Sequence, residues 1–152
     1  MLETLLGPLS SLVAKAVGRL AGQPHFKLIT SLVTPDYENR PGGYLALGLK
    51  IANVGRETAY FDRVEVVYRD GATQGVLVLG ISYETPVNSN RSVVAYLPAK
   101  QLLEPNLVDL IVYDAVERSY RLGKARFGAL RKQLAAERER LLAGGYQIDW
   151  QP

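Results

Sequence analysis

Residues Gly43 to Asn53 read GYLALGLKIAN, and this stretch decides the fold. Large apolar side chains recur at every second position. Successive side chains of an extended strand point to opposite faces, so a period of two predicts a strand with one buried face. The members of that face are Leu45, Leu47, Leu49 and Ile51.

The same alternation extends from Phe26 to Leu122 and is interrupted by short runs rich in Gly, Pro, Asn and Asp. These residues favour turns because they adopt or fix backbone conformations that strands do not use. The expected strands are Phe26–Thr34, Gly43–Asn53, Thr58–Arg69, Gly75–Tyr83, Ser92–Leu97, Leu107–Asp114 and Arg118–Leu122.

Short strands separated by turns predict a mainly β protein, an immunoglobulin-like antiparallel β-sandwich of about seven strands over residues 24–122. The turn Asn53-Val54-Gly55, placed directly after a strand, resembles a turn of many immunoglobulin-like modules. The length of 152 residues fits a single domain.

Helical periodicity flanks the sandwich on both sides. Apolar residues recur every three or four positions in residues 1–23, which predicts an amphipathic N-terminal helix that ends before Pro24. The segment 123–145 predicts an amphipathic C-terminal helix with a narrow apolar stripe, for which the first helix is the expected partner. The stripe consists of Phe127, Leu130, Leu134 and Leu141.

Residues 146–152 alternate again after a double glycine and predict a strand-like tail. Tyr146, Ile148 and Trp150 share one face of this tail. Leaving such large apolar side chains in water costs about 2 kcal/mol each. The tail is therefore expected to be buried, either on the chain's own sheet or in a neighbouring subunit.

Composition excludes several classes of protein. The chain has no cysteine, so disulfides and thiolate chemistry are excluded. The N-terminus lacks a basic region ahead of its apolar run, and no stretch reaches the roughly 20 apolar residues of a membrane span. We therefore expect no signal peptide, no transmembrane segment, and a place in the cytoplasm or within an assembly.

The residues that usually carry catalysis form no recognisable site. The single histidine, His25, has no second histidine and no cysteine with which to hold a metal or activate a nucleophile. Carboxylates close in sequence are expected to be solvated or paired with arginines, and no phosphate-binding glycine loop occurs. The sequence predicts a protein that is not an enzyme and that uses no metal and no cofactor. The carboxylates concerned are Asp36, Glu38, Asp62, Glu65, Asp109 and Asp114.

The favoured function is a non-enzymatic structural or interaction module, a subunit of an oligomeric assembly such as a virion or a surface complex. Its partner would be a second copy or another protein, contacted by the tail and the helices. The predicted partner-binding residues are Tyr146, Ile148, Trp150, Phe127, Leu130 and Leu134.

The alternative is a cytoplasmic adaptor that binds an acidic partner, nucleic acid or a membrane surface through its basic C-terminal helix. Seven cations and two acids fall between Arg121 and Ala143, although the net charge of the chain is only +3. These cations are spread around the helix, which favours a solvated face over nucleic-acid binding. The first helix carries few cations and is expected to pack on the sheet rather than on a membrane. The predicted contacts to an acidic partner are Lys124, Arg131, Lys132 and Arg138.

A third class is an enzyme with a carboxylate site or a carbohydrate-binding module. For the latter, Tyr113 and Tyr120 near Arg118 would supply aromatic rings. Cross-strand packing is the expected role of these two tyrosines.

Overall fold

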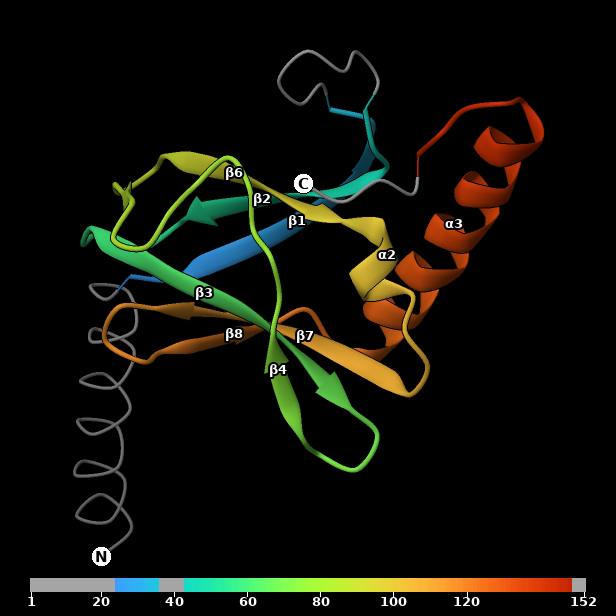
Figure 1. Cartoon of the computed structure of the whole chain (residues 1–152). Coiled ribbons are helices and arrows are strands. Elements are labelled where there is room, and N and C mark those ends of the chain that lie inside the picture. Colours follow the sequence, from blue (N-terminus) through green and yellow to red (C-terminus); the bar gives the residue numbers. More distant parts are fainter. Residues whose placement is uncertain (1–23, 36–42, 149–152) are drawn as a thin grey trace, which may run out of the picture.

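The computed structural model describes residues 24–35 and 43–148. In this part of the chain the protein is mainly β and forms two antiparallel sheets (Figure 1). One sheet has the order β1-β2-β6, and the other has the order β4-β3-β7-β8 with β5 paired to β3. The strands are β1 (Phe26–Val33), β2 (Ala46–Asn53), β3 (Ala59–Tyr68), β4 (Thr73–Gly75), β5 (Pro86–Val87), β6 (Ser92–Pro98), β7 (Leu107–Asp114) and β8 (Ser119–Arg121).

The core lies between the two sheets and follows the predicted alternation. Strand β2 contributes Leu47, Leu49 and Ile51, which are fully buried. Val64 of β3 and Leu110 of β7 belong to the same buried cluster. A shift of one residue in any strand would move its apolar side chains to solvent, so the alternation fixes which side of each strand faces the core.

The predicted strand Gly75–Tyr83 is wrong. Strand β4 ends at Gly75, and the chain then crosses to the edge of the other sheet. There Leu79 pairs with Tyr96 of β6 in an isolated bridge, and Gly80 follows with a φ of +87°. A left-handed glycine interrupts an extended backbone, and apolar alternation alone does not reveal it.

In the described part, helices α2 and α3 lie at one end of the two sheets (Figure 1). Helix α2 (Ala99–Leu102) is a single turn after β6, and helix α3 (Lys124–Ala143) falls within the predicted segment 123–145. The predicted apolar stripe of α3 is buried in the same core cluster as the strands. The first helix, its predicted partner, falls in residues 1–23, which lie outside the described residues.

The predicted strand-like tail is described only as far as Ile148. Residues 146–148 form no strand. Ile148 is 4% exposed in the core cluster, and its carbonyl oxygen accepts a 3.4 Å hydrogen bond from the Leu45 amide. The tail therefore contacts the chain's own fold at Ile148, whereas Trp150 lies outside the described residues.

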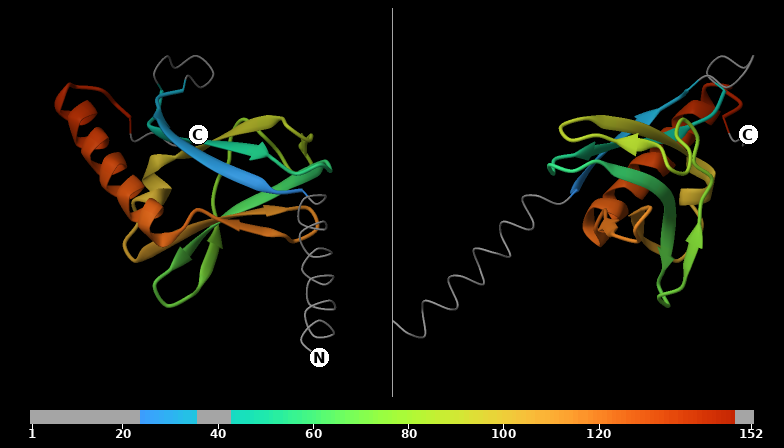
Figure 2. Two further views of the ribbon diagram at one scale, coloured as in Figure 1. Left: turned by 180° about the vertical axis from the view of Figure 1, so that it is seen from behind. Right: turned by 90° about the vertical axis from the view of Figure 1, so that its left-hand side faces the viewer.

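Three turns meet at the end opposite α3: residues 54–58, 88–91 and 115–118 (Figure 2). Backbone hydrogen bonds connect two of these turns to neighbouring strands, from the Asn53 amide of β2 to the Arg91 carbonyl (2.9 Å) and from the Ala115 amide to the Tyr60 carbonyl of β3 (2.8 Å). We call this the turn end of the two sheets. None of the helices in the described part is long and apolar enough to cross a membrane.

Candidate interaction surface

Asn53 organises the turn end from inside the protein. Its side chain is 1% exposed and its amide nitrogen donates to the carbonyl oxygens of Glu57 (2.7 Å) and Val87 (2.9 Å). Its Oδ1 accepts from the backbone amides of Gly55 (2.9 Å) and His25 (3.3 Å). One side chain thus fixes the ends of β1, β2 and β5 relative to one another, because each of its polar atoms is satisfied.

Asp114 has the same role in the turn 115–118. It is buried, and its Oδ1 accepts from the amides of Val116 (3.1 Å) and Arg118 (2.9 Å). Its Oδ2 faces the Tyr120 hydroxyl at 3.3 Å and the Arg118 guanidinium at 3.5 Å. Burial and the nearby Asp114 charge raise the pKa of Tyr120 to about 12. The Asp114 carboxylate therefore stabilises the turn 115–118.

Among the described strand residues, the outward side of the sheet β1-β2-β6 carries no acidic side chain. The strand register places its outward side chains in four cross-strand rows. Two rows lie near the turn end: Lys27, Ala52 and Ser92, then Ile29, Lys50 and Val94. Ile29 is 42% exposed and Val94 is 39% exposed. We call these two rows, together with Arg91 directly before β6, the basic face.

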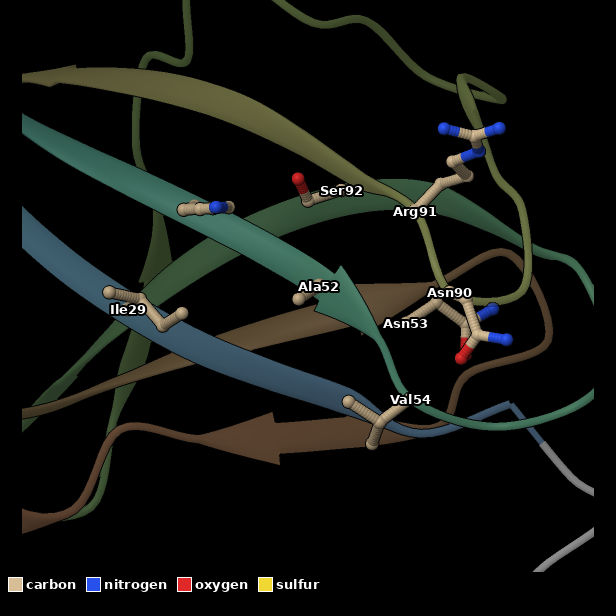
Figure 3. A pocket seen from close by; sticks show the side chains of 8 residues that line it. Ile29, Ala52, Asn53, Val54, Asn90, Arg91 and Ser92 are labelled. Carbon is tan, nitrogen blue, oxygen red and sulfur yellow. The ribbon is translucent and has the colours of Figure 1, made fainter.

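The cations of the basic face are exposed, and no acidic residue of the described part pairs with them. Within the described residues, Lys27, Lys50 and Arg91 make no ion pair. Lys50 and Arg91 line an open hollow of about 540 Å³ that runs from Ile29 on β1 to Ser92 on β6 (Figure 3). Unpaired cations beside exposed aliphatic side chains suit an anionic ligand that also has apolar groups.

The outward side of the other sheet differs in charge. Arg63 contacts the carboxylates of Asp62, Glu65 and Glu117, and its guanidinium lies 4.1 Å from the centre of the Tyr113 ring. The Arg63 hydrogen bond lowers the pKa of Glu117, and these acids raise the pKa of Arg63. The charges on this side are therefore balanced within the protein.

The predicted cations of α3 do not act as one group. Arg131 donates to the carbonyl oxygens of Leu107 (2.8 Å) and Glu104 (2.7 Å), so it connects α3 to the turn before β7. Arg138 also has an interaction within the protein. Lys124 and Lys132 are exposed. The structure thus leaves only two of the four predicted contacts without an internal role.

The predicted partner-binding residues fall into a buried group and an exposed one. Phe127, Leu130 and Leu134 are buried in the chain's own core, as is Ile148, so a partner cannot reach them in this fold. Tyr146 is 61% exposed. The apolar spacing identified buried residues correctly, but it could not distinguish the chain's own core from an interface.

Of the candidate catalytic carboxylates, Asp62 and Glu65 are neutralised by Arg63, and Asp36 and Glu38 lie outside the described residues. Among the described residues, no three His, Asp or Glu side chains are placed to hold a metal ion. Tyr113 pairs with Ser119 and Tyr120 pairs with Val112, so the two tyrosines point to opposite sides of their sheet. Tyr120 packs on Phe26 with ring centres 4.6 Å apart. Together they form no aromatic platform.

Sequence reasoning missed the basic face. Its signal was present, because Lys27 and Lys50 occupy the outward positions of two strands whose inward positions are apolar. What the sequence did not show is that β1 and β2 are neighbours in a register that places the two lysines diagonally. No protein-family model, curated protein sequence or solved structure matches this chain.

Proposed function

We propose that the chain is a non-enzymatic interaction module, a component of a larger assembly, that contacts its partner through the basic face. One observation carries this proposal. The two outward sheet surfaces differ, since one has its charges paired internally and the other presents cations that no described acidic residue pairs, beside exposed Ile29 and Val94. Partner surfaces are commonly distinguished by such charge complementarity.

An immunoglobulin-like identity of the fold belongs to this proposal. The immunoglobulin sandwich places its strands A, B and E in one sheet and C, F and G in the other. The orders β1-β2-β6 and β3-β7-β8 support the same assignment. Modules of this architecture present loops at the ends of the sandwich and serve many unrelated partners, so the fold supports a binding role without identifying the partner.

The surfaces favoured by the sequence have less support. Most of the predicted tail and helix contacts are buried in the core, and Arg131 is engaged by backbone carbonyls. Assembly through Tyr146 and contact with an acidic partner through Lys124 and Lys132 remain open to test by substitution.

Photo-cross-linking in the source cells tests the proposal. A photoreactive phenylalanine analogue replaces Val94 on the basic face or, as a matched control, exposed Ser119 on the outward side of the other sheet. We expect a discrete adduct with a second protein chain from position 94 alone. A second copy of this chain in that adduct would specify self-assembly.

Equal adducts from both positions, or no adduct from position 94, would overturn the proposed surface. Each position lies on the outside of a sheet, so we expect both variants to keep the fold. Circular dichroism of both variants checks this.

A further inference from the structure

We infer that the basic face binds an extended protein segment that carries carboxylates at alternate positions. This inference rests on the proposed function and specifies its partner. It starts from the strand register, in which Lys27 lies opposite Ala52 and Ile29 lies opposite Lys50. Lys27 and Lys50 are therefore diagonal neighbours on the same side of the sheet.

The spacing of these lysines matches an extended segment. Diagonal cross-strand neighbours lie about 7–8 Å apart. Residues i and i+2 of an extended chain lie about 6.6 Å apart and point to the same side. Two carboxylates in that arrangement can face Lys27 and Lys50 together, whereas adjacent acidic residues would point to opposite sides.

The positive charges of Lys27 and Lys50 favour binding of such an acidic segment. Lys27 and Lys50 repel each other, and no acidic side chain in the described part pairs with either. Arg91 continues the positive charge beyond the rows, and the hollow beside it reaches Ile29 and Val54 (Figure 3). A segment lying there would place its carboxylates on the cations and its aliphatic groups against these side chains.

The test uses two labelled peptides of identical composition. In one, glutamate alternates with threonine; in the other, pairs of glutamates alternate with pairs of threonines, so that no two glutamates lie two positions apart. Fluorescence anisotropy at low ionic strength compares their affinities for the full chain. We expect the alternating peptide to bind about fivefold or more tightly, and its affinity to fall as salt increases.

Charge reversal locates the site. Lys50→Glu should weaken binding of the alternating peptide by about fivefold or more, and it should fold because the new carboxylate lies diagonally to Lys27. Lys132→Glu on α3 changes the net charge equally and should leave the affinity within about twofold. Amide chemical shifts should move for residues of β1 and β2 in the unmodified chain.

Three results would overturn the inference: equal binding of the two peptides, equal losses in Lys50→Glu and Lys132→Glu, or tighter binding to phosphatidylserine vesicles or single-stranded DNA than to the alternating peptide. Failure of peptide binding together with a cross-linked adduct at position 94 would reject this ligand and keep the proposed surface. Failure of both experiments would reject the proposed function.

Discussion

Single polar side chains hold the turn end of this protein. The Asn53 side chain adds to the backbone hydrogen bonds where β2 ends. Its four hydrogen bonds satisfy backbone groups from three other segments. A buried polar network of this kind stabilises the fold only while every member is present, because an unpaired buried group costs about 1–3 kcal/mol.

Asn53→Ala should therefore lower the free energy of unfolding by about 3 kcal/mol, since it removes the acceptor of the Gly55 and His25 amides and a donor to the Val87 carbonyl. Exposed Asn88, whose side chain accepts from the Thr58 hydroxyl, provides the control, and Asn88→Ala should cost less than about 0.5 kcal/mol. Urea denaturation measures both changes. A loss below about 1 kcal/mol for Asn53→Ala would show that water satisfies the exposed groups.

Tyr120 makes stability sensitive to alkaline pH. Its pKa is about 12 in the folded protein and about 10 in an unfolded chain, so the unfolded chain releases this proton first. The stability contributed by the neutral hydroxyl is complete below about pH 10 and is lost as the pH rises to about 12.

Tyr120→Phe removes that titration. The variant should be less stable at neutral pH because Asp114 loses a donor, but its stability should fall less steeply between about pH 10 and 12. Urea denaturation at several pH values measures both slopes, and the other tyrosines contribute equally to the two proteins. Parallel slopes would contradict the raised pKa.

At the scale of elements, the crossing segment after β4 shows where sequence patterns stop being sufficient. The alternation correctly predicted β1, β2, β3, β6 and β7, because each buries one face against the opposite sheet. It failed for residues 76–83, where long-range contacts override the local pattern. Gln101 exchanges two hydrogen bonds with the backbone of Leu77, and Tyr96 lies against Gly80.

Gly80 should tolerate no side chain. A Cβ there would lie 2.9 Å from the Tyr96 ring, and φ is +87°. Gly71 has a similar φ of +91° but open space around it. A substitution at Gly71 therefore measures the cost of the backbone conformation without a steric clash. We expect Gly71→Ala to cost about 1 kcal/mol and Gly80→Ala about 1–2 kcal/mol more, measured by urea denaturation. Equal costs would mean that the Tyr96 ring moves aside.

Arg131 should act as a structural link of α3 rather than as a binding residue. Arg131→Met keeps the apolar part of the side chain and removes the hydrogen bonds to Leu107 and Glu104, which should cost about 2 kcal/mol of stability. Lys132→Met, one position further on the exposed side, should cost less than about 0.5 kcal/mol. Thermal unfolding distinguishes the two. Equal stability of the two variants would mean that the Arg131 hydrogen bonds do not stabilise the fold, and Arg131 would again be a candidate for binding an acidic partner.

At the scale of the whole molecule, the packed core and the proposed partner surface lie in different parts of the protein. Helix α3 lies at one end of the sheets and contributes its apolar side chains to the core, whereas Lys27, Ile29 and Lys50 of the basic face are exposed (Figure 2). Apolar periodicity predicted these side chains of α3. The basic face was not predictable in the same way, because Lys27, Lys50 and Arg91 come from separate segments that only the strand register brings together.

The tail provides the decisive comparison between self-packing and self-assembly. Ile148 is buried in the core and Tyr146 is exposed, two positions apart on the same segment. Ile148→Asp should lower the free energy of unfolding by about 2–3 kcal/mol, because it buries a charge or exposes the core. Tyr146→Asp should leave stability within about 0.5 kcal/mol. Light scattering then reports the solution mass of each protein.

An unchanged mass for Tyr146→Asp is expected, since the partner surface proposed above lies on the basic face. A fall in mass for Tyr146→Asp at unchanged stability would instead identify Tyr146 as a contact between subunits. The same outcome would support the tail-mediated assembly predicted from the sequence, because Ile148 would then anchor the segment within its own chain while Tyr146 contacts the neighbour.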